Sequence, residues 1–219
     1  DLDPIEYSIV DQPAGGSLGA IDQGAGTVVY TAAADFAGID TFTYRATAAG
    51  EDSGVAVATV TVRPDTSVGG ASGLTSDNTP TFTFGSPQSG TIFECRIDGG
   101  SWSACASPLT ADELADGSHT FDVRARAGAG GPFDASPASA TVTVDTTAPA
   151  PVLQRASAQD DPTNDAAIAF ELAADEDLDP ATVTTDDFEV TNGSLDAVSG
   201  SGSTISIDVT AAGEGAVEI

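Results

Sequence analysis

Residues 93–105 read FECRIDGGSWSAC and residues 114–127 read LADGSHTFDVRARA, and these two segments contain both cysteines, the only tryptophan and the only histidine. Phe93, Cys95 and Ile97 alternate with charged residues. The Asp98-Gly99-Gly100 run that follows supplies residues that tolerate positive φ in a hairpin loop. The first segment is therefore expected to double back as a β-hairpin.

The hairpin places the two cysteines close to each other. If residue 97 faces residue 103 across the loop, Cys95 lies opposite Cys105, at the short cross-strand separation that a disulfide needs. We therefore predict a Cys95–Cys105 disulfide. A zinc site would need four ligands, and the chain has only one histidine beside its two cysteines. Cysteine pairing in turn favours an oxidising, extracytoplasmic compartment.

The second segment has the alternation of a half-buried strand. His119, Phe121, Val123 and Ala125 fall on one face, and polar residues fall on the other. His119 invites a catalytic or metal-binding interpretation, but its inward position favours a structural role. Trp102 could stack on a sugar or a base, and packing inside the hairpin is the favoured alternative.

Turn signals and strand patterns recur along the chain in blocks of roughly 70 to 80 residues, so several small domains are expected in a chain of 219 residues. Aromatic residues make up 6% of the sequence, which predicts thin cores. No apolar run approaches the roughly 20 residues that span a bilayer, so membrane insertion is not expected. The chain has no methionine, which indicates a mature or excised piece.

The chain is strongly acidic, with 34 acidic and six basic residues and a net charge of −28. Nucleic acids and anionic membrane surfaces should be repelled by this charge. One interpretation is a solvated acidic surface that keeps the protein soluble, and the other is binding of divalent cations.

Calcium is the cation that the sequence favours. Calcium takes six to eight oxygen ligands, and alternating acids in a loop can direct several carboxylates to one point. The candidate ligands are Asp175, Asp177, Asp179 and, nearby in the sequence, Asp187. The alternative at these positions is a solvated run of charge.

The first block, residues 1–64, has strand-like alternation throughout, and a slip in its last strand between Val57 and Val60 suggests a β-bulge. The block resembles the cadherin-like repeats of large bacterial surface proteins. The matching residues are Asp1-Leu2-Asp3, Ser8-Ile9-Val10 with Pro13 and Gly16, Val29-Tyr30-Thr31, Asp35-Phe36-Ala37-Gly38 and Asp40-Thr41-Phe42-Thr43-Tyr44. The opening strands of that family are not found before Asp1.

The second block, residues 65–148, resembles bacterial Ig-like repeats that carry a Phe-x-Cys pair, an Asp-Gly-Gly turn, a tryptophan, a second cysteine and then Asp-Gly-x-His-x-Phe. These features occupy Phe93 to Cys105 and Asp116 to Ala125. The resemblance implies a β-sandwich spacer in a secreted or surface protein, with no catalytic residues to carry over.

The third block, residues 149–219, is similar to Ig-like repeats of bacterial adhesins over Phe170 to Gly193. That family has a further strand after the equivalent of Ile219. Six strands are expected here, at residues 152–156, 167–172, 187–191, 194–198, 204–209 and 216–219.

Together these patterns predict an all-β chain of three tandem Ig-like β-sandwich domains in an extended array, the first and last of them lacking strands. Sequence outside this piece could fill the gaps, or a neighbouring copy could donate strands and propagate a filament.

The leading functional hypothesis is a non-catalytic structural or adhesive segment of an extracellular or cell-surface bacterial protein, stalk or filament. Its partners would be other copies or neighbouring repeats. The alternative is a carbohydrate- or protein-binding module accessory to a secreted enzyme. An enzyme is not expected, because no Ser, His and acid constellation and no phosphate-binding loop is present.

Overall fold

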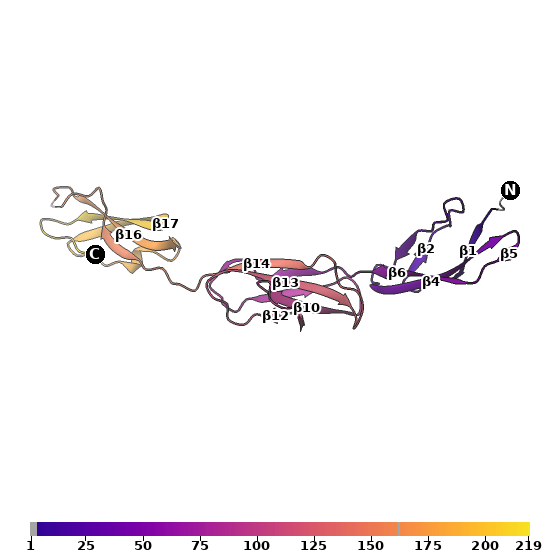
Figure 1. Cartoon of the computed structure of the whole chain (residues 1–219). Helices are drawn as coiled ribbons and strands as arrows, with labels where there is room; N and C mark the ends of the chain where they lie inside the picture. The colour runs from indigo at the N-terminus through magenta and orange to yellow at the C-terminus, as the bar shows by residue number, and fades with distance from the viewer. Residues whose placement is uncertain (1–3, 162) are drawn as a thin grey trace. The chain divides into compact units, whose positions relative to one another are not determined.

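The computed structural model describes residues 4–161 and 163–219, and Asp1 to Asp3 of the first block's resemblance lie outside the described residues. Regular structure in the described residues consists of β-strands and one three-residue 3-10 helix, which confirms the predicted all-β class (Figure 1). In that same part of the chain, no helix is long and apolar enough to cross a membrane. The chain divides into two compact units, Asp1–Thr146 and Thr147–Ile219. The division into three domains at residues 64 and 148 stays a prediction.

Two groups of strands make up the first unit, and the first group comes from residues 4–63, here called the first repeat. It has a four-stranded sheet in which the long strand β4 pairs with three others, and a separate two-stranded sheet. The four-stranded sheet contains β1 (Glu6–Asp11), β4 (Gly38–Ala48), β5 (Glu51–Asp52) and β6 (Ala56–Val62). The two-stranded sheet contains β2 (Gly16–Leu18) and β3 (Tyr30–Ala32).

Residues 65–146, here called the second repeat, form two sheets. One has five strands in the order β11 (Ser103–Cys105), β10 (Thr91–Ile97), β13 (Gly117–Ala127), β14 (Ala138–Val144) and β8 (Gly73–Thr75). The other has three strands in the order β12 (Leu109–Thr110), β9 (Thr81–Gly85) and β7 (Ser67–Gly70). Long strands β10, β13 and β14 lie side by side in Figure 1.

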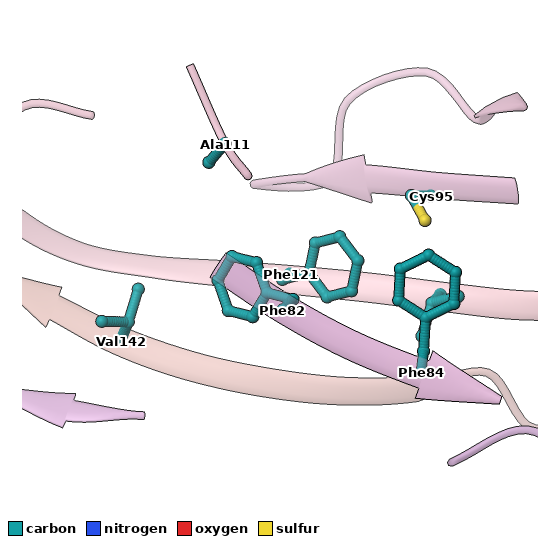
Figure 2. Close-up of a cluster of buried hydrophobic side chains, with 7 residues drawn as sticks. Phe82, Phe84, Cys95, Ala111, Phe121 and Val142 are labelled. Atoms are coloured by element: carbon teal, nitrogen blue, oxygen red, sulfur yellow. The ribbon is translucent and has the colours of Figure 1, made fainter. Parts of the chain in front are cut away.

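An aromatic core joins these two sheets into a sandwich (Figure 2). Phe82 of β9 stacks on Phe121 of β13 with ring centroids 4.3 Å apart. Phe84 lies 5.8 Å from Phe121 and meets Phe93 edge-on at 5.2 Å. Phe121 is 1% exposed and Val123 is fully buried, so the inward face predicted for this strand is confirmed.

The two repeats share one hairpin register. β4 pairs with β6 from Gly38 opposite Val62, and β13 pairs with β14 from Gly117 opposite Val144. On the other side, Ile9 of β1 lies opposite Tyr44, as Cys95 of β10 lies opposite Val123. The residues of β4 and β6 therefore correspond one to one with those of β13 and β14, and those of β1 up to Ile9 correspond with those of β10 up to Cys95.

The two repeats differ at the edges of these sheets. β14 has β8 as a second neighbour, whereas β6 pairs only with β4 among the described residues. β6 reads AVATVTV and contains no ionisable side chain. The opposite edge, at β1, is capped by Gln23, whose amide accepts a hydrogen bond from Tyr7 N–H (2.7 Å) and donates one to Tyr7 C=O (2.9 Å).

The predicted bulge in the last strand of the first block is wrong. β6 pairs with β4 without a register shift, and Val57 is 65% exposed. The slip in the apolar pattern is therefore accommodated by an outward-facing valine. A shift occurs instead in β1, between Ile9 and Asp11.

The second unit contains a three-stranded sheet and differs from the six strands expected. Its elements are β15 (Val152–Arg155), β16 (Ala167–Leu178), the 3-10 helix η1 (Thr185–Asp187) and β17 (Gly193–Ala211). Ile168, Phe170 and Leu172 of β16 lie opposite the buried residues Val209, Ile207 and Ile205.

Two of the expected strands in this unit lie in one element, β17. Gly193 lies beside Thr210 and Gly200 beside Thr204, so β17 doubles back on itself. Gly200 and Gly202 have φ of 135° and 76°, which glycine adopts at little cost in such a turn.

Strands were also expected at residues 187–191 and 216–219, and both predictions are wrong. Only an isolated bridge joins Thr191 to Glu218. Asp187 instead belongs to η1 and caps its N-terminus, because its carboxylate accepts hydrogen bonds from the backbone N–H and the hydroxyl of Thr184.

Candidate functional site

The chemically distinctive residues of the chain gather on the β10–β11 hairpin. A disulfide joins Cys95 and Cys105, with Cα atoms 5.8 Å apart. Asp98 and Gly99 have φ of 51° and 69°, as expected for the loop. The expected register is wrong by two residues, because Cys95 lies opposite Ser103. The disulfide therefore links diagonal neighbours, which its tolerated range of Cα separations allows.

Arginine and aromatic side chains alternate beside this hairpin, in a group here called the ladder: Arg96, Trp102, Arg124, Phe133 and Arg126. The guanidinium groups of Arg96 and Arg124 lie 4.4 and 4.3 Å from the centroid of Trp102. Those of Arg124 and Arg126 lie 4.0 and 4.7 Å from the centroid of Phe133. Three of the six basic residues therefore make cation–π contacts with the rings of Trp102 and Phe133. Contacts of this kind contribute about 0.5–2 kcal/mol each.

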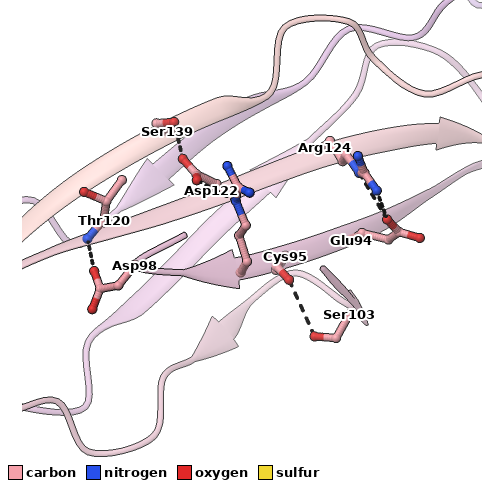
Figure 3. Close-up of polar contacts among 9 residues, drawn as sticks. Glu94, Cys95, Asp98, Ser103, Thr120, Asp122, Arg124 and Ser139 are labelled. Atoms are coloured by element: carbon pink, nitrogen blue, oxygen red, sulfur yellow. Dashed lines mark hydrogen bonds and ion pairs between the residues drawn. The ribbon is translucent and has the colours of Figure 1, made fainter. Parts of the chain in front are cut away.

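Carboxylates fix two of the three arginines of the ladder in place (Figure 3). Glu94 accepts hydrogen bonds from Nε (3.1 Å) and Nη2 (2.6 Å) of Arg124. Asp122 accepts one from Nε of Arg96 at 2.9 Å and another from the hydroxyl of Ser139. Trp102 is therefore packed against cations, and the ladder ties β10, β13 and the hairpin loop together. The sequence analysis placed the polar residues of β13 only on an outward face. The alternating Arg124 and Arg126, together with Arg96 and a loop tryptophan, are the signal that could have revealed the ladder.

Replacing Arg124 by lysine is expected to lower the free energy of unfolding by about 1–3 kcal/mol, because an ammonium group lacks the planar guanidinium that holds Glu94 through Nε and Nη2 while lying over two rings. Arg45→Lys is the matched control, since Arg45 is the corresponding residue of the first repeat and makes an exposed ion pair with Asp52 at 2.8 Å. Denaturant titration followed by circular dichroism measures both variants. Equal losses would show that the ladder contributes nothing.

His119 is held by two acceptors. Its Nδ1 lies 2.7 Å from Oδ2 of Asp98, and its Nε2 lies 2.7 Å from the carbonyl oxygen of Ala115. Because a backbone carbonyl and a carboxylate both accept, the pair favours the doubly protonated imidazolium. The hydrogen bond to Asp98, followed by that to Ala115, raises the pKa of His119 above 6.5. The same contact, followed by a hydrogen bond from Thr120 N–H, lowers the pKa of Asp98 below 3.8.

A pH dependence of stability follows. Because the pKa of His119 is raised in the folded state, protonated His119 stabilises the fold fully below pH 6.5, and this stabilisation is lost as pH rises through the folded-state pKa. Because the pKa of Asp98 is lowered, its carboxylate stabilises the fold above pH 3.8, and this stabilisation is lost as pH falls through the folded-state pKa. Wild type is therefore expected to exceed His119→Gln in unfolding free energy between these values, with the difference shrinking from pH 6.5 upward. Denaturation at pH 5.5, 7 and 9 measures it, and a constant difference would contradict the assignment.

An open cleft of about 290 Å³ lies in the first repeat. It is lined by Tyr7, Ile9, Ile21, Gly26, Thr27, Val28, Phe42 and Tyr44. None of these side chains is acidic or basic, in a chain that carries 34 acidic residues. The cleft is therefore an uncharged surface, with aromatic side chains at Tyr7, Phe42 and Tyr44, that the sequence analysis did not identify.

Asp40 is a buried carboxylate that ties the two sheets of the first repeat together. It accepts hydrogen bonds from the backbone N–H groups of Ala14 (3.1 Å), Gly15 (2.9 Å) and Thr41 (2.9 Å) and from the hydroxyl of Tyr30 (2.9 Å). Burial alone would raise the pKa of Asp40, but the hydrogen bonds from Tyr30, Gly15, Ala14 and Thr41 lower it below 3.8. The pKa of Tyr30 is raised by burial and by this carboxylate.

The four expected calcium ligands are not brought together. Asp175 accepts a hydrogen bond from Ala150 N–H, Asp179 accepts one from Ala181 N–H, and Asp187 accepts those from Thr184. Among the described residues, no three acidic, histidine or cysteine side chains form a group that could hold a metal. Calcium binding there stays a prediction, which calorimetric titration with calcium tests.

A wider concavity of about 1230 Å³ lies in the second unit. Its lining includes Ile168 and Phe170 together with Asp160, Asp161, Asp165 and Glu214. Arg155 pairs with Asp161 at 2.6 Å. The carboxylates make this surface acidic, in contrast to the uncharged cleft of the first repeat.

A search of curated proteins gives no match to the chain. Residues 1–63 match the family model of the bacterial Ig domain, which is the region of the first repeat and of the uncharged cleft. The match is to an Ig domain, whereas the first block suggested a cadherin-like repeat. It supports an Ig-like β-sandwich fold and a bacterial Ig-like domain over these residues.

Proposed function

We propose that the chain is a non-catalytic structural and adhesive segment of an extracellular bacterial surface protein, with other copies or neighbouring repeats as its partners. One observation carries the proposal. The residue types that ordinarily perform chemistry, namely the two cysteines, the histidine and the tryptophan, are all used to brace the β10–β13 region of the second repeat.

Two further observations support this function. The match of residues 1–63 to the bacterial Ig domain favours a module that acts by shape and contact. The Cys95–Cys105 disulfide is compatible with an oxidising compartment outside the cytoplasm.

The proposal carries an expectation about length. If tandem β-sandwich domains stack end to end, they would extend on the order of 100 Å, at about 3.3 Å per strand residue.

Small-angle scattering of the chain tests the proposal, and a single compact globule would contradict it. The second candidate is a carbohydrate- or protein-binding module, which the cleft lined by Tyr7, Phe42 and Tyr44 favours. A glycan array separates the two candidates for sugars. A structural segment should bind no glycan, whereas a carbohydrate module should bind one and should lose it when Tyr44 is replaced.

A further inference from the structure

Four of the six arginines of the chain pair with a carboxylate, and the other two lie against one residue, Phe133. The paired arginines are Arg45, Arg96, Arg124 and Arg155. Arg63 and Arg126 form no ion pair with any of the described residues, although the chain carries 34 acidic residues. Within the described part of the chain, the two cations without a carboxylate are therefore gathered at one place.

Arg63, Arg126 and Phe133 form a surface that is here called the arginine corner. Arg63 donates a hydrogen bond from Nη1 to the carbonyl oxygen of Phe133 at 2.9 Å. The guanidinium of Arg126 lies 4.7 Å from the centroid of the Phe133 ring, and its Nε donates to the carbonyl oxygen of Gly131 at 3.1 Å. A guanidinium group has five N–H donors, and these bonds use one of them in each arginine. Both arginines therefore keep donors for a carboxylate.

A complementary surface occurs in the most acidic part of the chain. Residues 149–219 contain 15 acidic residues and one arginine. Asp175, Asp177 and Asp179 are exposed at alternate positions along the end of β16, whereas Leu178 between them is buried. Neighbouring carboxylates of this acidic row are about 7 Å apart, because two strand residues separate them. Two of them can therefore meet two guanidinium groups that lie against a single residue.

We propose that the arginine corner of one molecule binds the acidic row of a second copy of the chain. A guanidinium group recognises a carboxylate through two parallel N–H donors, which gives such a contact direction as well as energy. Because the corner and the row are different surfaces, the contact is heterologous and adds copies head to tail. The inference rests on the proposed function and deepens it by naming the surfaces through which copies meet.

The net charge of −28 opposes the approach of two copies over a distance that depends on salt. The screening length is about 30 Å at 0.01 M salt, about 8 Å at 0.15 M and about 3 Å at 1 M. At low salt the whole-molecule repulsion dominates, and at 1 M the ion pairs of the contact are themselves screened. Association is therefore expected to be strongest near 0.15 M and weaker at either extreme.

Sedimentation of the full chain at about 0.15 M salt tests the proposal. The mean mass of wild type is expected to rise with protein concentration. Arg126→Glu and Asp177→Arg each bring like charges together, so each is expected to weaken association about tenfold or more. An equimolar mixture of these two variants is expected to restore association, because the substituted positions then carry opposite charges across the contact. This restoration also shows that neither variant fails merely through damage to its fold.

Arg45→Glu is the matched control, because it changes the net charge by the same amount as Arg126→Glu at an arginine that already pairs with Asp52. It is expected to leave association within about twofold of wild type. Equal losses in the two variants would show that only the total charge matters and would overturn the arginine corner. A wild type that stays monomeric up to about millimolar concentration, or a mixture that does not restore association, also overturns the proposal.

A uronic acid oligosaccharide is the probe for the other source of carboxylates. Wild type is expected to bind it no more tightly than Arg126→Glu does. Binding that Arg126→Glu abolishes, in a chain that does not self-associate, would assign the corner to an acidic glycan and overturn the proposed partner. The scattering that tests the proposed function is measured on dilute, separate copies, so failure of this inference is distinguishable from failure of that function.

Discussion

Replacing Phe121 by alanine is expected to lower the free energy of unfolding of the second repeat by about 3–5 kcal/mol, which is the usual cost of removing a fully buried phenylalanine. Phe121 is 1% exposed and contacts both Phe82 and Phe84, so the substitution leaves a cavity between the two sheets. The only tryptophan, Trp102, lies in this repeat, and its fluorescence in a denaturant titration reports the transition.

Phe42→Ala is the matched control, because Phe42 occupies the corresponding position of the first repeat. Phe42 lines the open cleft, and among the described residues its ring contacts Tyr44 at a centroid distance of 6.4 Å rather than stacking on two phenylalanines, so its loss should be smaller. A larger loss at Phe42 than at Phe121 would contradict the comparison of the two repeats. Such a result would also argue against an open cleft beside Phe42.

Asp40→Asn is expected to destabilise the first repeat by about 2–4 kcal/mol, because an amide group would face donors that now bond to the carboxylate. Each oxygen of Asp40 accepts two hydrogen bonds, and an asparagine side chain offers only one acceptor oxygen. Asp35→Asn, at an exposed turn, is the control and should change stability by less than about 0.5 kcal/mol. Thermal and denaturant unfolding followed by circular dichroism measures both.

The loss of stability caused by Asp40→Asn should depend on pH. A carboxylate whose pKa is lowered in the folded state stabilises the fold above the unfolded value of 3.8, and the contribution is lost as pH falls through the folded-state pKa. The difference between wild type and Asp40→Asn should therefore be full at pH 7 and shrink below pH 3.8. A difference that persists undiminished into strong acid would show that the charge of Asp40 is not what the donors require.

Local patterns in the sequence predicted much of the second repeat. The alternation from His119 to Ala125 predicted which face of β13 is buried, because a strand sends successive side chains to opposite faces. The Asp98-Gly99 turn was likewise visible in residue types. The cysteine register was not, because a loop length can vary by two residues without changing which side chains face inward.

The ladder and the cleft depend on contacts between segments far apart in the sequence. Arg124 meets Trp102 and Phe133 only because β10, β13 and two loops come together. The cleft became recognisable because the two repeats share a register, in which Phe42 and Phe121 occupy corresponding positions. In the second unit, Asp187 was expected in a strand, but its carboxylate bonds Thr184 in a helical turn. Side-chain hydrogen bonding there outweighed the β propensity of the residues that follow.

Among the described residues β6 pairs only with β4, and this edge bears on the colloidal behaviour of the protein. An uncharged strand of seven residues with an open edge is a template on which another strand can assemble, and β6 carries no lysine, proline or acidic residue that would hinder this. Long-range repulsion between molecules of net charge −28 therefore keeps these edges apart at neutral pH. That repulsion vanishes near the isoelectric point of about 4.1 and is screened in concentrated salt. Acidic or high-salt storage would thus favour ribbons joined through β6, in which the folded repeats themselves remain intact.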